Sequence, residues 1–350
     1  MTDYRLYSAV WEITLACCFS CRYCGSAGGR ARENELTTEE CVSVAEQLAQ
    51  LGCKRVSLIG GEIFMRPDWL EICTALSGRG IRVNIITNGF LFTDRIINDL
   101  RNARIESVSV SLDGPKNVHD KYRQNGSYDR ALLALHTLRN AGIPVSVIST
   151  LNSENVSRLD ELLEILRDSG IYAWQLQACS PMGNAASNGV AYAFDPRQAI
   201  GFVKKHMNSV HFALGVADNI GYFGPSEGSI RGNRSGKAYF MGCRAGISSV
   251  GIDSAGNVRG CESMYDTAFN EGNLREKTLR EIWEDKNAFR YNRHFDPSLL
   301  TGACADCEIG PYCAGGCRSY NYFCHGKLYE APRCARALDL TEKDLSVIST

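Results

Sequence analysis

The stretch Cys17-Cys18-Phe19-Ser20-Cys21-Arg22-Tyr23-Cys24 decides how the rest of the chain is interpreted. It places the thiols of Cys17, Cys21 and Cys24 on one short loop with the spacing C-x3-C-x2-C. Three thiolates spaced in this way can hold three irons of a cubane cluster, and the fourth iron is then left without a protein ligand. The sequence therefore predicts a reactive iron–sulfur site here. A zinc loop or unrelated thiols in a turn are the alternatives.

The composition excludes several classes of protein. With 350 residues the chain has room for one large domain, or for a large domain and a smaller one. Its 38 basic and 39 acidic residues give a net charge of -1, so nucleic acid and anionic membranes are not expected partners. The N-terminus lacks a secretory signal, and no apolar stretch is long enough to span a bilayer, so we expect a cytoplasmic protein. In a reducing compartment, 16 cysteines indicate metal or catalytic ligands rather than disulfides.

A strand followed by a helix recurs through the first part of the chain. The first predicted helix begins after a capping box formed by Thr37 and Glu40 and ends at Gly52. Alternating strands and helices predict a parallel sheet with right-handed crossovers. The predicted strands cover residues 9–15, 55–59, 81–87, 107–112, 144–150 and 172–178.

Four motifs follow predicted strands directly: the loop of residues 17–24, Gly60-Gly61-Glu62, Asn88 and Asp113. The carboxyl ends of parallel strands lie on one face of the sheet, where the active sites of such folds are found. We therefore expect these motifs to converge, although Asp113 can also simply shape the turn before Pro115.

The pattern changes after about residue 195. A helix over 196–207 leads into a glycine-rich stretch over 221–242, which we interpret as a connection or a substrate-facing loop. The predicted domains are residues 1–195, a connection over 196–242, and a cysteine-rich domain over 243–350.

The cysteine-rich part contains a second ordered pattern. Cys243, Gly256 and Cys261 have the form C-x12-G-x4-C, a C-x2-C-x5-C-x3-C run follows, and Cys334 ends the series. The run consists of Cys304, Cys307, Cys313 and Cys317. Spacing alone favours a pair of structural zinc sites, because C-x2-C knuckles hold zinc well.

The N-terminal half resembles the radical S-adenosylmethionine (SAM) enzymes, whose signature is C-x3-C-x2-C with an aromatic residue before the last cysteine, here Tyr23. The resemblance implies a partial (β/α)6 barrel in which SAM chelates the open iron and is cleaved to a 5′-deoxyadenosyl radical. It implies that Gly60-Gly61-Glu62 meets the SAM amino group, and glycines allow such a close approach. Ser111 and Arg123 resemble the residues for the SAM ribose and carboxylate. Asn88 and Gln177 are further candidates for SAM binding.

The C-terminal part resembles the SPASM domain, a small α+β module with two auxiliary iron–sulfur clusters, so that we expect three [4Fe-4S] clusters in all. The resemblance assigns Cys304, Cys307, Cys313 and Cys334 to one auxiliary cluster. It assigns Cys243, Cys261 and Cys317 to the other, which is then one ligand short. Some relatives carry an eighth cysteine where this chain has Ser249. An open iron for substrate, an unidentified ligand and Cys324 are the possibilities.

Two residues are candidates for catalysis. Glu262 stands where sulfatase-maturing relatives carry an aspartate that acts as a base, and a carboxylate beside a cluster can take a substrate proton. Cys179 follows the sixth predicted strand, and its thiol can donate a hydrogen atom to a product radical, as in radical epimerases. The alternatives are a surface glutamate and a small buried hydrophobe.

Taken together, the resemblances imply an enzyme that modifies a ribosomally made peptide by a C–C or thioether crosslink or by epimerisation. Auxiliary clusters favour net oxidation, and therefore crosslinking. The alternatives are a formylglycine-generating sulfatase-type maturase, which Glu in place of Asp at position 262 weakens, a small-molecule enzyme for an aminosugar or tetrapyrrole, and a zinc-stabilised binding module.

The expected partners are a peptide and an electron donor such as flavodoxin or ferredoxin. The first predicted strand begins near residue 9, which leaves no room before it for a leader-binding domain. We therefore expect the peptide to be recognised by a separate protein, or directly by the barrel and the 221–242 stretch.

Overall fold

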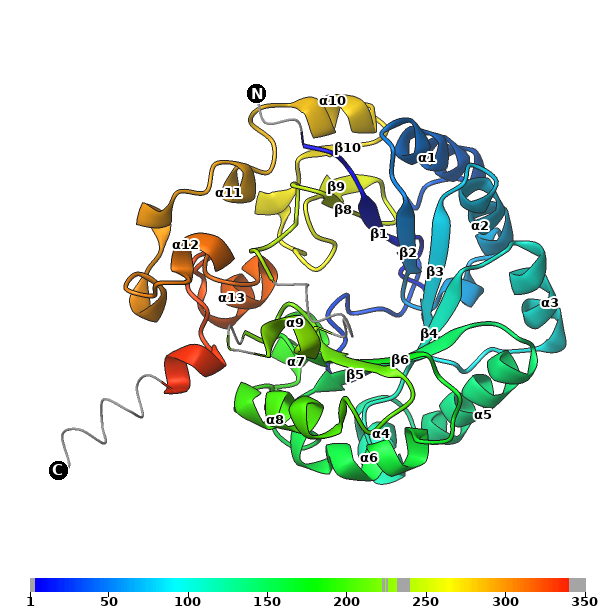
Figure 1. Cartoon of the computed structure of the whole chain (residues 1–350). Helices are drawn as coiled ribbons and strands as arrows, with labels where there is room; N and C mark the ends of the chain where they lie inside the picture. The colour runs from blue at the N-terminus through cyan, green and yellow to red at the C-terminus, as the bar shows by residue number, and fades with distance from the viewer. Residues whose placement is uncertain (1–3, 222–223, 225, 232–239, 340–350) are drawn as a thin grey trace.

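A single ten-stranded sheet organises the computed structural model, which describes residues 4–221, 224, 226–231 and 240–339. The strand order is β10-β9-β8-β1-β2-β3-β4-β5-β6-β7, and β1 to β8 pair in parallel. The sheet curves into an open barrel with helices outside it (Figure 1). The strands are β1 (Ser8–Glu12), β2 (Arg55–Ile59), β3 (Arg82–Thr87), β4 (Ser107–Ser111), β5 (Val145–Leu151), β6 (Ala173–Ala178), β7 (Ala213–Val216), β8 (Ser249–Ile252), β9 (Asn257–Arg259) and β10 (Gly272–Asn273).

Helices cover the outer face of the barrel and build the C-terminal part. The predicted capping box of Thr37 and Glu40 is present at the start of α1, and Gly52 has a φ of 82° after its end. The longer helices are α1 (Thr38–Gln50), α2 (Trp69–Ser77), α3 (Asp94–Asn102), α4 (Lys116–Tyr122), α5 (Ser127–Asn140), α6 (Leu159–Leu166), α8 (Pro196–His206), α10 (Leu279–Glu284) and α13 (Arg318–His325). The shorter ones are α7 (Asn184–Ser187), α9 (Glu227–Ile230), α11 (Arg290–Arg293) and α12 (Gly310–Cys313). None of the helices described is long and apolar enough to cross a membrane.

The strands alternate between a packed outer face and an inner face that carries both polar and apolar side chains. In β6, Trp174 and Leu176 are buried in the hydrophobic core, whereas Gln175 and Gln177 line a central cavity. Successive side chains of a strand point to opposite faces, so one face packs against helices and the other faces the barrel interior. This alternation leaves the interior lined by groups that can bind a polar ligand.

The predicted partial barrel is confirmed, and the sheet extends beyond it at both edges. The strand β7 adds to β6 within the stretch interpreted as a connection, and β8 pairs in parallel with β1 from inside the cysteine-rich part. Both strands have only four residues, too few for a sequence pattern to show. The C-terminal part therefore continues the barrel sheet. Much of the 221–242 stretch lies outside the described residues.

Candidate functional site

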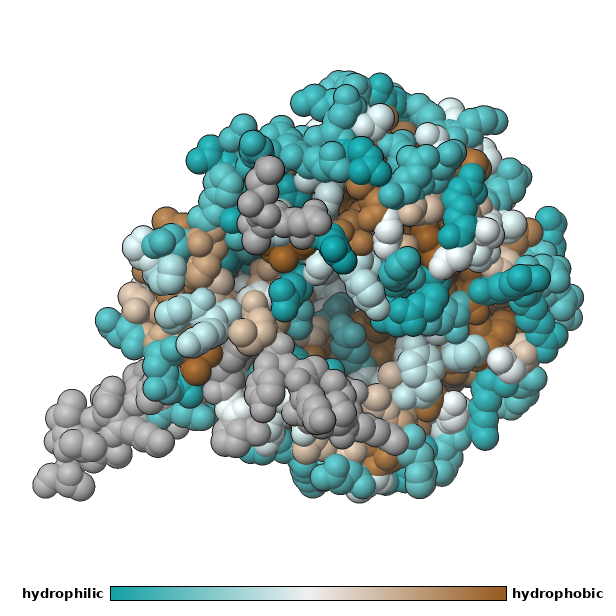
Figure 2. Space-filling model, turned by 45° about the horizontal axis from the view of Figure 1, so that its top comes forward, coloured by the Kyte–Doolittle hydropathy of each residue, from teal (hydrophilic) through white to brown (hydrophobic). Residues whose placement is uncertain are grey.

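One cavity of about 720 Å³ lies inside the barrel at the carboxyl ends of the strands. We call it the central cavity. The face shown in Figure 2 is largely hydrophilic and is hollowed near its centre. Cysteines from the N-terminal, middle and C-terminal parts of the sequence line the cavity, namely Cys17, Cys21, Cys24, Cys179, Cys261 and Cys317. The predicted SAM-binding residues Tyr23, Gly60, Gly61, Asn88, Ser111, Arg123 and Gln177 also line it. The convergence expected from topology is therefore present.

Hydrogen bonds to its main chain hold the cysteine loop at the end of β1. The Leu15 amide donates to Glu35 Oε1 at 2.7 Å, and the Cys17 amide donates to the Gly29 carbonyl at 2.8 Å. The side chain of Asn184 donates to the Cys21 carbonyl at 3.0 Å. Burial raises the pKa of Cys21 to about 11, so this thiol keeps its proton until a metal displaces it.

The Gly60-Gly61 pair packs directly against the start of this loop. The Gly61 amide donates to Thr14 O at 2.8 Å, and the Glu62 amide donates to Ala16 O at 2.6 Å. A Cβ on Gly61 would overlap the backbone oxygens of Leu15 and Ala16. The glycines therefore permit the loop itself to approach β2. Their predicted contact with the SAM amino group stays a prediction, which their position in the cavity wall allows.

We expect Gly61→Ala to displace the cysteine loop, because a methyl group there meets main-chain atoms that cannot rotate away. The variant should lose SAM cleavage at least tenfold and lose iron from the N-terminal site. Gly29→Ala is the matched control, since a Cβ at Gly29 meets nothing within 4 Å in the same loop. Iron analysis and 5′-deoxyadenosine production measure the effect, and equal behaviour of the two variants would contradict it.

Glu62 lies behind the cavity wall rather than in it. Its buried carboxylate accepts hydrogen bonds from Thr87 Oγ1 at 2.9 Å and from the Asn88 amide at 2.8 Å. Asn88 Nδ2 then points at the cysteine loop, 3.5 Å from Cys18 Sγ and 4.0 Å from Cys17 Sγ. Glu62 thus positions Asn88 beside the loop.

The same carboxylate makes stability depend on pH. Burial raises the pKa of Glu62 from 4.5 to about 7, against the hydrogen bonds from Asn88 and Thr87. Because this pKa is higher in the folded than in the unfolded protein, the protonated carboxyl stabilises the fold. Its contribution to the free energy of unfolding is fully present below pH 4.5 and is lost as the pH rises through about 7. At 1.4 kcal/mol per pKa unit, the wild type should lose about 2 kcal/mol relative to Glu62→Gln between pH 5 and pH 8. Anaerobic urea unfolding of both proteins measures this difference, and parallel pH curves would contradict it.

Asp113 joins three of the groups around the cysteine loop. Its carboxylate accepts hydrogen bonds from the Tyr23 hydroxyl, from Arg123 Nε and from the Thr150 amide, the last at 2.8 Å. Although burial raises the pKa of Asp113, the charge of Arg123 outweighs it and holds that pKa below its usual value. Arg123 also lies over the Tyr23 ring, 5.6 Å from its centroid. Asp113 therefore fixes the predicted carboxylate-binding arginine, a role that sequence reasoning missed.

Cys179 and Cys324, the two thiols whose roles the sequence does not decide, lie close to each other. Cys179 is buried in the cavity wall, and burial raises its pKa to about 12. Cys324 interacts with the hydroxyls of Tyr192 and Tyr320 and electrostatically with Cys179. None of these neighbours of Cys324 is Cys243, Cys261 or Cys317. The position of Cys324 therefore does not favour it as the fourth ligand of the cluster assigned to those three cysteines. Ser249, the other position considered, lies in β8.

Glu262 is buried in the cavity wall next to Cys261. Its side chain is 5% exposed, and its buried Oε1 has no hydrogen-bond partner among the described residues. Burial, and then the charge of Glu12, raise its pKa well above the usual value. The two nearby arginines bind other acids, Arg32 to Glu12 and Arg259 to Asp253 at 2.5 Å. Glu262 is therefore a free carboxyl that faces the cavity.

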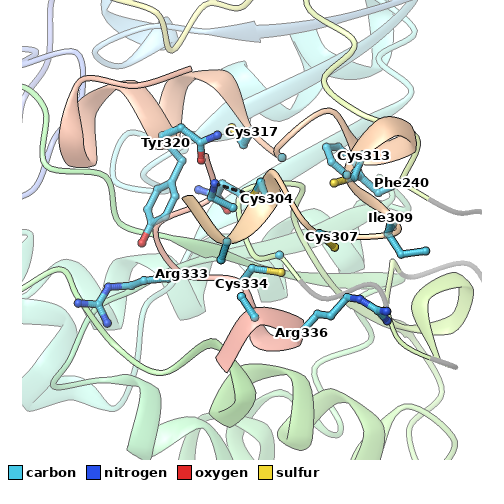
Figure 3. Close-up of a pocket in the computed structure, with 18 of the residues that line it drawn as sticks. Phe240, Cys304, Cys307, Ile309, Cys313, Cys317, Tyr320, Arg333, Cys334 and Arg336 are labelled. Atoms are coloured by element: carbon cyan, nitrogen blue, oxygen red, sulfur yellow. Dashed lines mark hydrogen bonds between the residues drawn. The ribbon is translucent and has the colours of Figure 1, made fainter. Parts of the chain in front are cut away.

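The C-terminal cysteines form two groups. Cys304, Cys307, Cys313 and Cys334 line a second pocket, which we call the outer pocket (Figure 3). Cys243, Cys261 and Cys317 interact electrostatically with one another, and burial raises the pKa of Cys261 to about 12. The outer pocket and the central cavity share four lining residues, namely Asp218, Asn219, Cys317 and Tyr320. Asp218, which follows β7, was missed because that strand was not predicted.

The donor set fits iron–sulfur clusters better than single zinc ions. Within the described residues, no three His, Cys, Asp or Glu side chains converge so as to hold one metal ion. A cubane binds each thiolate at a separate iron, so its ligands need not meet at a point. The grouping of thiols around two cavities matches that requirement. The loop thiols Cys17, Cys21 and Cys24 line the central cavity, and their neighbour Cys18 is not among its lining residues.

A curved parallel sheet with a cysteine loop at its carboxyl edge and a cysteine-rich extension defines the class of protein. Residues 11–166 match the Radical SAM superfamily, and residues 243–308 match the SPASM iron–sulfur cluster-binding domain. The chain belongs to the radical SAM superfamily and is a radical SAM enzyme with a SPASM domain. Its predicted fold class and its enzymatic nature are thereby confirmed.

Three known proteins show how wide this similarity is. The chain is 31% identical to an AdoMet-dependent heme synthase of Methanosarcina barkeri, over 93% of this chain and 95% of the relative. It is 29% identical to the mycofactocin maturase MftC of Mycolicibacterium smegmatis, over 89% and 78%. The crystal structure of Streptococcus suis SuiB bound to S-adenosylmethionine matches with a TM-score of 0.76 at 17% identity, over 93% and 76%. This last likeness concerns the fold.

Proposed function

We propose that the protein oxidises a ribosomally made peptide, with hydrogen abstraction at one end of the central cavity and electron acceptance at the other. When bound, SAM and the iron–sulfur clusters supply a 5′-deoxyadenosyl radical and an acceptor for the electron that net oxidation releases. One observation carries the proposal: Cys17, Cys21 and Cys24 line the same cavity as Cys261 and Cys317. A substrate in that cavity lies between the two sites, which favours a C–C or thioether crosslink over epimerisation.

The chain's own residues would perform three tasks. Cys17, Cys21 and Cys24 would hold the N-terminal [4Fe-4S] cluster, with seven C-terminal cysteines for two auxiliary clusters. The cavity-lining SAM candidates, with Arg123 held by Asp113, would bind and orient SAM. Glu262 would take the substrate proton in its ionised form, because it lines the cavity and its buried Oε1 has no hydrogen-bond partner among the described residues. Cys179 would donate hydrogen only in an epimerising reaction.

The charges in the cavity wall suit an amide- or amine-bearing substrate. The two lining arginines are both paired with acids, Arg123 with Asp113 and Arg231 with Glu227 at 2.7 Å. Asp218 faces the cavity with no hydrogen-bond or ion-pair partner among the described residues. A peptide backbone or amine complements such a wall. A flavodoxin or ferredoxin would supply electrons, and a separate leader-binding protein could present the peptide.

The second candidate is a tetrapyrrole substrate, which the 31% identity with a heme synthase favours. A direct comparison decides between the two. Anaerobically reconstituted protein is given SAM and reductant with either candidate precursor peptides or Fe-coproporphyrin III, the tetrapyrrole for which another relative, a synthase of Methanosarcina barkeri, is named. Substrate-dependent 5′-deoxyadenosine and product mass are measured. We expect stimulation and a loss of two hydrogens from a peptide. Turnover of Fe-coproporphyrin III without any peptide product would support the tetrapyrrole instead.

A further inference from the structure

Arg318 is a completely buried arginine at the start of α13, directly after Cys317. Its side chain is 0% exposed. Among the residues that the structure describes, no carboxylate forms an ion pair with it. An arginine keeps its charge under all ordinary conditions, and a buried charge without a counter-charge costs several kcal/mol. Some negative group that balances Arg318 is therefore expected nearby.

The neighbours of Arg318 on most sides are neutral. Its Nη1 donates to the carbonyls of Ala314 and Leu328, the latter at 3.1 Å. Its guanidinium lies over the Tyr329 ring, 4.4 Å from the centroid, and 5.6 Å from that of Phe295. Its Nη2 is buried and has no hydrogen-bond partner among the described residues. These contacts hold the guanidinium in place without cancelling its charge.

The remaining electrostatic interactions of Arg318 are with thiols from both auxiliary groups. They involve Cys243 and Cys317, two of the three cysteines outside the outer-pocket set, and Cys313, which lines the outer pocket. The geometry agrees, because Arg318 directly follows Cys317 and its Nη1 donates to the carbonyl of Ala314, the residue after Cys313. A cluster held by thiolates carries net negative charge, and its potential depends on nearby charge and hydrogen bonds. The buried cation thus lies where it acts on both sites.

We propose that Arg318 is the internal counter-cation of the auxiliary clusters and raises their reduction potential. This inference rests on the proposed ligand assignment. A fixed positive charge stabilises the more negative, reduced form of a cluster, so it favours the acceptance of an electron at that site. Arg318 is a positioning residue in this role, because it acts through the clusters and does not contact substrate.

The test is a redox titration of the reconstituted holoenzyme, followed by electron paramagnetic resonance of the auxiliary signals with dithionite as reductant. In Arg318→Met and Arg318→Gln, the equilibrium constant for one-electron reduction should fall at least tenfold, which is a midpoint lower by 59 mV or more. Arg318→Lys keeps the charge and should stay near the wild-type midpoint. A loaded neutral variant with the wild-type midpoint would overturn the proposal.

A second arginine, which is half-buried, provides the control. Arg293 lies over the rings of Trp283 and Phe289, at 4.8 and 4.6 Å from their centroids, and its buried Nη2 also has no hydrogen-bond partner within the described part of the chain. The groups that interact electrostatically with Arg293 are tyrosines and acids, namely Tyr4, Tyr291, Glu271 and Asp285, and include no cysteine. Arg293→Met should therefore leave the midpoints unchanged, and an equal shift in this variant would overturn the proposal.

Iron content decides the outcome if the neutral variants do not load clusters. Loading by Arg318→Lys together with failure of Arg318→Met and Arg318→Gln would show that the charge is required, as proposed. Failure of all three would indicate a packing role and overturn the inference. Wild-type protein with zinc and no iron in its C-terminal part would instead refute the proposed function, so the two failures are distinguishable.

Discussion

The triple variant Cys17→Ala/Cys21→Ala/Cys24→Ala should lose SAM cleavage completely while its C-terminal part keeps iron. These three thiols line the central cavity from one loop, and the seven C-terminal cysteines lie in separate segments. If each site holds one [4Fe-4S] cluster, the variant should lose about one third of its iron. Anaerobic iron and sulfide analysis and chromatography of 5′-deoxyadenosine measure both effects. Residual 5′-deoxyadenosine production would refute the assignment.

Cys18→Ala is the matched control for this variant. Cys18 lies in the same loop and accepts a hydrogen bond from Asn88 Nδ2 at 3.5 Å, yet it is not among the residues that line the central cavity. It also keeps a C-x2-C-x2-C spacing with Cys21 and Cys24, so it is the alternative ligand to Cys17. We expect Cys18→Ala to keep full iron content and SAM cleavage. Loss of the cluster in Cys18→Ala but not in Cys17→Ala would show that Cys18, and not Cys17, is the cluster ligand.

The strand-end motifs could be predicted because a parallel sheet brings its carboxyl ends to one edge. The cysteine loop, Gly60-Gly61 and Asn88 needed only the order of strands and helices to be placed together. Asp113 shows what this reasoning lacks. Its partners Tyr23 and Thr150 are 90 and 37 residues away along the chain. The sequence around Asp113 therefore looks the same whether the residue binds these partners or only shapes a turn. Contacts between side chains far apart in the sequence produce no periodic pattern from which they could be predicted.

Glu262 and Arg318 show why the burial of a side chain was harder to predict than its location next to a cysteine. Glu262 was expected next to a cysteine, but its burial depends on the close packing of β8, where a Cβ on Gly251 would overlap the Glu262 backbone. Arg318 gave no signal at all, since an arginine after a cysteine is ordinarily a solvated charge. In both cases the tertiary contact overrides the usual behaviour of the residue type.

Glu262→Gln should separate SAM cleavage from substrate oxidation. Glutamine keeps the size of the side chain but cannot accept a proton, so a step that needs the base should slow by about 10²- to 10⁴-fold. SAM cleavage without substrate needs no such base and should continue at the wild-type rate. The measurement is the ratio of modified peptide to 5′-deoxyadenosine, which should fall to a similar extent.

The same variant also tests whether Glu262 binds metal instead. It lies next to Cys261, so a ligand role would appear as lost iron or as an altered paramagnetic resonance spectrum of the auxiliary clusters. We expect neither change in Glu262→Gln. Glu262→Asp, which keeps the carboxyl on a shorter side chain, should recover part of the product yield. Glu12 and Asp253, the acids nearest to Glu262, are each bound to an arginine, so neither of them is free to replace it. Wild-type product yield in Glu262→Gln would exclude Glu262 as the base and leave the substrate proton to another acid of the central cavity, such as Asp218, or to solvent.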